Sequence, residues 1–202
     1  DGFARYRRDY EALEKKAGYA AAYRFIAPIF GGSRRSEFLE LARTQFDETY
    51  SRYYFSASLA ILKRLEHNGV RNYIISASAD FFVDGAAASL ELPEERFHGV
   101  QLQSDGDLLS DRIAEPFPYA AGKTARIQQI VAELKASEDT PHVFVIAGFG
   151  NSPHTDGHFL NWIASQELPD GRPYSVMINA PSEERTNPKI QYVDQAELVS
   201  QR

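Results

Sequence analysis

The fold is decided by the stretch HVFVIAGFGNSPHTD at residues 142–156. It begins as an uninterrupted apolar run, continues into a turn containing Gly148 and Gly150, and ends in the carboxylate of Asp156. A short apolar run bounded by turn residues is typical of a strand buried on both faces of a parallel sheet. The stretch therefore predicts a strand over residues 142–147 whose end presents polar groups at the sheet edge.

A helix followed by a strand is predicted at two places in the chain. An amphipathic helix around residues 127–134 leads into this strand, and a helix over 55–67, closed by Asn68-Gly69, leads into a β-rich run at 70–75. Further strands are expected at 174–178 and 190–193, and Asp105-Gly106 marks a hairpin. This alternation predicts an α/β fold, a three-layer αβα Rossmann-like core with a parallel sheet. The strands at 73–75 and 143–147 are expected to be central neighbours in it.

The first fifty-odd residues carry apolar side chains at helical spacing and are expected to be all-helical. We therefore divide the chain into a helical segment over residues 1–54, which the family resemblance described below makes a cap, and a core over 55–202. The helical part holds seven of the eleven tyrosines, which are Tyr6, Tyr10, Tyr19, Tyr23, Tyr50, Tyr53 and Tyr54. They are expected either to pack the helices together or to line a pocket for a cationic head group through cation–π attraction.

The composition of the chain argues against two classes of binding partner. The net charge of -6 and the absence of any Lys/Arg block argue against nucleic acid. No apolar run approaches the ~20 residues of a membrane span, so no membrane partner is expected. The chain has no cysteine, which removes disulfides and thiolate metal sites from consideration.

Three places that follow strands or open helices can bind an anion or a metal. Ser76, in Ile-Ile-Ser-Ala-Ser, can hydrogen-bond an anion, although a serine there can also simply cap a helix. Lys123 opens a helix whose N–H groups favour anions, although it can equally be a solvated surface lysine. Phe117 stands where a nucleotide-binding P-loop requires glycine, which excludes that motif.

The third place is the turn after residue 147, where Asp156 can supply an oxygen ligand for Mg²⁺. A dinucleotide fingerprint is incomplete here, because Pro153 replaces its third glycine. A zinc site made of His154, Asp156 and His158 is disfavoured, because residues at i, i+2 and i+4 spread around a helix.

In this order, the three places resemble the motifs of the haloacid dehalogenase superfamily, in particular its phosphoserine-phosphatase-like branch with a helical cap. Ser76 matches the second motif, whose hydroxyl and the following backbone N–H of Ala77 contact the phosphoryl group. Lys123 matches the lysine of the third motif. Asn151 and Asp156 match the fourth motif, which supplies Mg²⁺ ligands.

The sequence departs from this pattern at two positions. Asn151 stands where an acidic residue is usual, so Asp156 is expected to be the principal metal ligand. The first motif, an Asp-x-Asp strand that carries the nucleophile, is not found and would lie upstream of Asp1. Asp47 lies inside a predicted helix, and Asp1-Gly2 is followed by Phe3 instead of threonine.

The resemblance implies a Mg²⁺-dependent hydrolase that acts on a small phosphorylated metabolite through an aspartyl-phosphate. The main alternative is a binding or regulatory module of the same fold that lacks the nucleophile. The dehalogenases of the superfamily fit less well, because they need no metal ligand and would leave Asp156 without a role.

Overall fold

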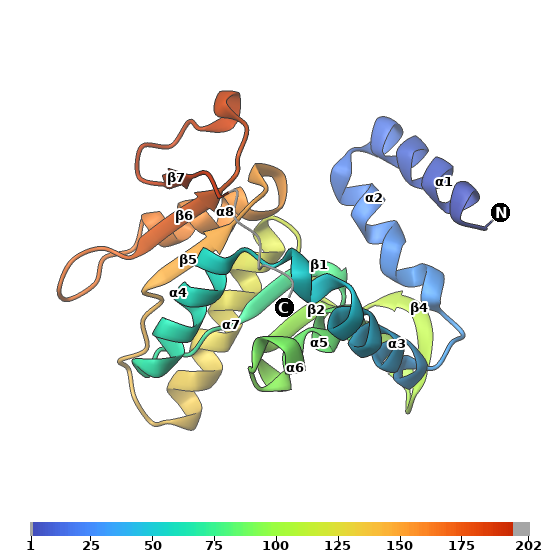
Figure 1. Ribbon diagram of the computed structural model, residues 1–202, viewed down its shortest axis with the longest axis horizontal. Helices are drawn as coiled ribbons and strands as arrows, with labels where there is room; N and C mark the ends of the chain where they lie inside the picture. Colours follow the sequence, from blue (N-terminus) through green and yellow to red (C-terminus); the bar gives the residue numbers. More distant parts are fainter. Residues whose placement is uncertain (1, 196–202) are drawn as a thin grey trace. The chain divides into compact units, whose positions relative to one another are not determined.

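The computed structural model describes residues 2–195, and Figure 1 shows its helices and strands. The chain divides into two compact units, one running to Phe117 and the other beginning at Pro118. Each unit is described by itself below. In the described part of the chain, no helix combines the length and the apolar character needed to cross a membrane.

The first unit begins with the predicted helical segment. Its elements are α1 (Gly2–Ala17), α2 (Tyr19–Ile26), η1 (Ala27–Phe30), α3 (Arg35–Glu48) and η2 (Tyr50–Tyr53). Gly18, with φ of 83°, lets the chain reverse between α1 and α2, which lie side by side in Figure 1. Tyr6 stacks on Phe25 at 6.0 Å, and the Tyr10 and Tyr23 rings meet edge to face at 6.4 Å. These tyrosines therefore pack the two helices together.

The rest of this unit is mixed. It contains α4 (Ser56–His67), β1 (Ile74–Ala79), α5 (Asp80–Gly85), α6 (Ala87–Leu90), η3 (Glu94–Arg96), β2 (Phe97–Val100), β3 (Leu102–Asp105) and β4 (Leu108–Ile113). Strand β1 pairs in parallel with β2, whereas β3 and β4 form the predicted antiparallel hairpin. Gly69, with φ of 77°, follows α4 as expected.

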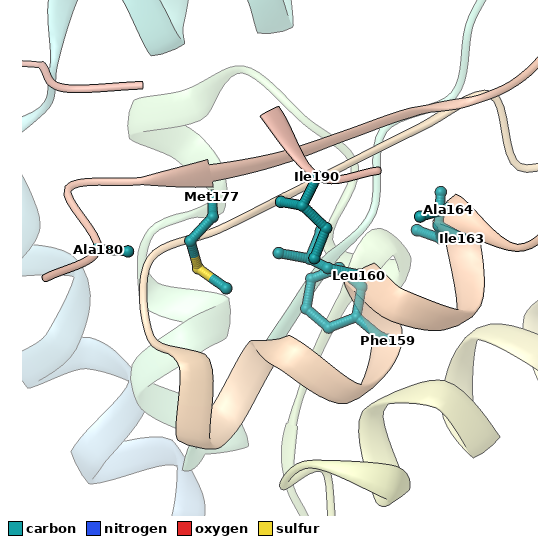
Figure 2. Close-up of a cluster of buried hydrophobic side chains, with 7 residues drawn as sticks. All are labelled: Phe159, Leu160, Ile163, Ala164, Met177, Ala180 and Ile190. Atoms are coloured by element: carbon teal, nitrogen blue, oxygen red, sulfur yellow. The ribbon is translucent and has the colours of Figure 1, made fainter. Parts of the chain in front are cut away.

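The second unit is a three-stranded parallel sheet with helices. Its elements are α7 (Ala121–Ser137), β5 (Ala147–Gly150), α8 (Pro153–Ala164), β6 (Tyr174–Ile178), η4 (Ser182–Glu184) and β7 (Gln191–Val193). The strand order is β5-β6-β7. Figure 2 shows the core between α8 and this sheet, which consists of Phe159, Leu160, Ile163, Ala164, Met177, Ala180 and Ile190. The unit thus has the α/β character that the sequence indicates.

The predictions for β1 and β5 have different outcomes. The two strands lie in different units, so the expectation that they are direct neighbours stays a prediction. Within the described residues, β1 pairs only with β2, and β5 pairs only with β6. The expected bounds need correction, because β1 begins at Ile74 instead of residue 70 and β5 begins at Ala147 instead of residue 142.

Candidate functional site

Ser76 lies in a bulge of β1. Ile75 pairs with His98 and Ala79 with Val100, so four steps along β1 match two steps along β2. The extra residues, Ser76 to Ser78, leave the regular ladder. The Ser76 hydroxyl oxygen accepts a hydrogen bond from the Ser78 N–H at 3.1 Å, which closes a local turn. The Ser76 O–H and the nearby backbone N–H groups are the donors that an anion would need here.

Gly99 on β2 allows this bulge to pack closely. A Cβ added at Gly99 would lie 2.5 Å from the Cα of Asp80 and 2.8 Å from the carbonyl oxygen of Ser78. Real Cβ atoms essentially never come so close to backbone. The bulge is therefore built into the pairing of the two strands.

An ion-pair cluster follows directly after the bulge. Arg35, at the start of α3, donates from Nε to Asp80 at 3.1 Å and from Nη2 to Asp84. The other Asp80 oxygen, Oδ1, is buried without a hydrogen-bond partner in the described structure. Burial raises the pKa of Asp84 to about 6, and the neighbouring Asp80 adds to this while Arg35 opposes it. The cluster ties the helical segment to the residues that follow Ser76.

Sequence reasoning missed this cluster. Arg35 and Asp80 are 45 positions apart, and neither belongs to a local motif. The only signal was the charged residue Asp80, two positions after Ser-Ala-Ser, and it does not reveal its partner.

In the second unit, Lys123 and Asp156 form a buried ion pair. Lys123 lies in the first turn of α7, and its ammonium donates to Asp156 Oδ1 at 2.6 Å. The two side chains are 8% and 6% exposed. The alternative of a solvated surface lysine is therefore contradicted. The Ala120 N–H also donates to the Thr155 carbonyl at 3.1 Å, which fixes the start of α7 against α8.

Asp156 also shapes the turn between β5 and α8. Its Oδ2 accepts the backbone N–H groups of Asn151 at 2.9 Å and Ser152 at 3.1 Å. Ser152 caps α8 by accepting the Thr155 N–H. The side chain of Asn151, in contrast, is exposed. Lys123, Asn151 and Asp156 are thus brought together, as the resemblance implies.

His158, which lies near this turn, contacts a residue of α7. His158 Nδ1 lies 2.9 Å from the hydroxyl of Thr124, which is buried. Asp156 faces Lys123 instead. In the described chain, no three His, Cys, Asp or Glu side chains gather closely enough to hold a metal ion.

Ser76 and Ala77 lie in the first unit, whereas Lys123, Asn151 and Asp156 lie in the second. Their action on one phosphate stays a prediction, as does the division into a cap over 1–54 and a core over 55–202.

The fold of the chain is similar to that of several solved structures. The chain matches a HAD family hydrolase from Salmonella enterica serovar Typhi with a TM-score of 0.57 and 16% identity, over 91% of this chain and 56% of that one. It matches a probable phosphoserine phosphatase from Vibrio cholerae with a TM-score of 0.61 and 13% identity, over 95% and 52%. The chain has the haloacid dehalogenase fold. It spans about half the length of these two proteins.

A protein of unknown function from Bordetella pertussis Tohama I gives a TM-score of 0.73 at 13% identity, over 95% of this chain and 82% of that one. No family model and no curated protein matches the sequence. At these identities, the similarity shows the fold of the chain and does not show its activity.

Proposed function

We propose that the protein is a Mg²⁺-dependent phosphomonoester hydrolase acting on a small phosphorylated metabolite. The observation that carries the proposal is the buried Lys123 ammonium, held by Asp156 at 2.6 Å in a haloacid dehalogenase fold. A positive charge that is already in place needs no reorganisation when negative charge shifts in the transition state. The bulge at Ser76 supports the same chemistry, because it frees hydrogen-bond donors from the strand ladder.

In the proposed reaction, an aspartate carboxylate attacks phosphorus and the P–O bond to the substrate alcohol breaks. A second aspartate protonates the leaving oxygen and then takes a proton from the water that cleaves the aspartyl-phosphate. Ser76 and the Ala77 N–H would donate to the phosphoryl oxygens, and Lys123 would neutralise their charge. Bound Mg²⁺ would add further charge neutralisation.

The nucleophile is proposed to come from an Asp-x-Asp strand outside these 202 residues. Asp80 follows β1, two positions after the bulge at 76–78, and is the nearest alternative along the chain. Its Oδ2 is hydrogen-bonded to Arg35, and its side chain is only 13% exposed. Asp80 is therefore poorly placed to attack a substrate.

A second candidate is a phosphate-binding module without turnover. It is favoured by the exposed Asn151, a neutral side chain at the position where the resemblance calls for a metal-binding carboxylate. Such a protein would bind phosphate and release it unchanged.

Hydrolysis of p-nitrophenyl phosphate separates the two candidates. The chain extended at its N-terminus to include an Asp-x-Asp strand should hydrolyse it with Mg²⁺, and the 202 residues alone should not. Lys123→Ala should lower turnover about 10²-fold or more, as expected for the loss of one preorganised charge. Lys135→Ala, which changes an exposed lysine at the other end of α7, is the control. Phosphate binding without turnover in the extended chain would favour the binding module.

A further inference from the structure

The first two helices form a hairpin that is held mainly by its own contacts. None of the residues of α1, all of which the structure describes, is buried, and α1 packs mainly on α2. The rings of Tyr6 and Phe25 stack at 6.0 Å across the two helices. In α2, which is also described in full, only Ala22 is buried, and one methyl group contributes little hydrophobic area. The hairpin can therefore move against the rest of its unit with little loss of burial.

The helical elements that follow are, in contrast, fixed. The ring of Phe30, at the end of η1, lies 4.8 Å from that of Phe38 in α3 and 5.2 Å from that of Phe81 in α5. A Cβ added at Gly85 would lie 2.5 Å from the Cβ of Ala42, so α3 and α5 cross in close contact. The element η1 also packs on β4. Both η1 and α3 therefore move only with the body of the unit.

Pro28 marks the joint between the movable and the fixed part. It lies at the start of η1 and has no N–H to donate to the Arg24 carbonyl, four residues earlier. The hydrogen-bond ladder of α2 therefore cannot continue through it, and helices bend at such positions. A small backbone rotation next to Pro28 would swing the hairpin as one body.

A set of contacts, which we call the latch, joins α2 to the loop after β4. Arg24 Nη2 donates to Glu115 Oε1 at 2.9 Å, and the Arg24 guanidinium lies 4.6 Å from the centre of the Phe117 ring. The other Glu115 oxygen accepts the Phe117 N–H at 2.7 Å. The side chains of Arg24 and Glu115 are 48% and 62% exposed. Exposed ion pairs contribute little and weaken with salt, so this latch can open.

We propose that α1 and α2 form a hinged lid that pivots at Pro28 and is held in place by the latch. Helix α2 packs against β1, the strand with the bulge at Ser76, so opening of the lid uncovers this part of the unit. The movable part thus ends at Ile26 and not at residue 54. The motion rests on the contacts alone, whereas the admission of a phosphorylated substrate past the lid rests on the proposed function.

Pulsed EPR distance measurements on the 202-residue chain test the proposal. Because the chain has no cysteine, spin labels attach only at introduced ones. Ala12→Cys with Gln103→Cys joins α1 to β3, and Glu40→Cys with Gln103→Cys joins α3 to β3, all at exposed positions. The first pair of labels should show a broad or double distance distribution, and the second pair a single narrow one.

Arg24→Ala should raise the population of the open lid about fivefold, the effect of losing an exposed ion pair and a cation–π contact. Glu115→Gln removes the charge and keeps an oxygen for the Phe117 N–H, so it should raise this population about threefold. It should also abolish the effect of salt on the lid distances, which the natural chain should show. Arg7→Ala, which breaks an exposed ion pair within α1, is the control and should leave the lid distances unchanged.

Two results would overturn the proposal. One is a lid distance that Arg24→Ala leaves unchanged or shifts no more than the α3 distance. The other is a loss of helical circular dichroism in the opened variants, because the hairpin would then unfold instead of pivoting. These readouts need no phosphatase activity, so a failure of the proposed function is seen separately.

Discussion

Gly99 and Asp80 approach each other so closely that no side chain fits between them: a Cβ on Gly99 would lie 2.5 Å from the Cα of Asp80. Gly99→Ala should therefore push the bulge away from β2 and destabilise the protein by about 1–3 kcal/mol, the usual cost of overpacking. Urea unfolding followed by circular dichroism measures this. Gly157→Ala is the control, because no atom lies within 4 Å of its added Cβ. It should be neutral or stabilising, since alanine favours helix. Equal effects of the two changes would contradict the packing argument.

The Arg35–Asp80–Asp84 cluster predicts a pH effect on stability. The pKa of Asp84 in the folded state is raised to about 6 from 3.8, so the folded protein binds this proton more tightly than the unfolded chain does. The resulting stabilisation is fully present below pH ~4 and is lost as pH rises through about 6. Asp84→Asn removes the charge and should therefore be more stable than the natural chain at pH 7, by about 1–3 kcal/mol.

Denaturant unfolding between pH 4.5 and 7.5 tests this prediction. The stability difference between Asp84→Asn and the natural chain should grow with pH across this range. Asp105→Asn, which changes an exposed residue of the β3–β4 hairpin, should show no such trend. A difference that shrinks with pH would show that pairing with Arg35 outweighs burial.

The helices and the hairpin were predictable because their signals are local. Residues 2–53 have the expected helical elements, Gly69 follows α4 in the required conformation, and β6 has the predicted bounds of 174–178. Strand partners were not predictable. The apolar run at 142–147 predicted a strand buried on two faces, but Phe144 and Ile146 are exposed and the strand begins only at Ala147. The hydrogen-bond partner of each peptide lies far away in sequence.

The candidate site was predictable only in part, because contacts between residues distant in sequence leave no local signal. Lys123 and Asp156 were found from motif order, and the structure joins them. The sequence could not show that Asp156 already has partners at both oxygens, because backbone N–H groups carry no residue-specific signal. It also could not pair Arg35 with Asp80 and Asp84, which depends on how α3 packs on α5.

The core shown in Figure 2 gives a prediction on packing. Leu160 is 0% exposed, so Leu160→Ala should cost about 2–5 kcal/mol through lost burial and the cavity left behind. Leu108→Ala removes the same atoms from a residue that is 51% exposed and should cost less than about 1 kcal/mol. Chemical denaturation of the two variants measures the difference. Similar costs would mean that the cluster relaxes around the missing side chain.

A pair of serines isolates the value of one buried hydrogen bond. The Ser175 hydroxyl, in β6, donates to the Leu160 carbonyl at 2.8 Å and is buried, whereas the Ser165 hydroxyl donates to the Trp162 carbonyl in solvent. Ser175→Ala should cost about 1 kcal/mol, and Ser165→Ala should cost close to nothing, because water replaces the lost donor. Thermal melts of both variants provide the comparison. A larger loss from Ser165→Ala would contradict this reasoning.

The pairing of β5 on one side only, within the described residues, affects the self-association of the 202-residue chain in solution. Phe144 and Ile146 lead into this strand and Phe149 lies within it, and all three are exposed. A strand with apolar side chains and one edge without a ladder partner in the described part of the chain is a template on which a second molecule can align its own backbone. Turbidity should therefore rise with protein concentration. Replacing Ile146 by lysine should slow the rise in turbidity, because a charge near the strand edge disfavours pairing with a second molecule.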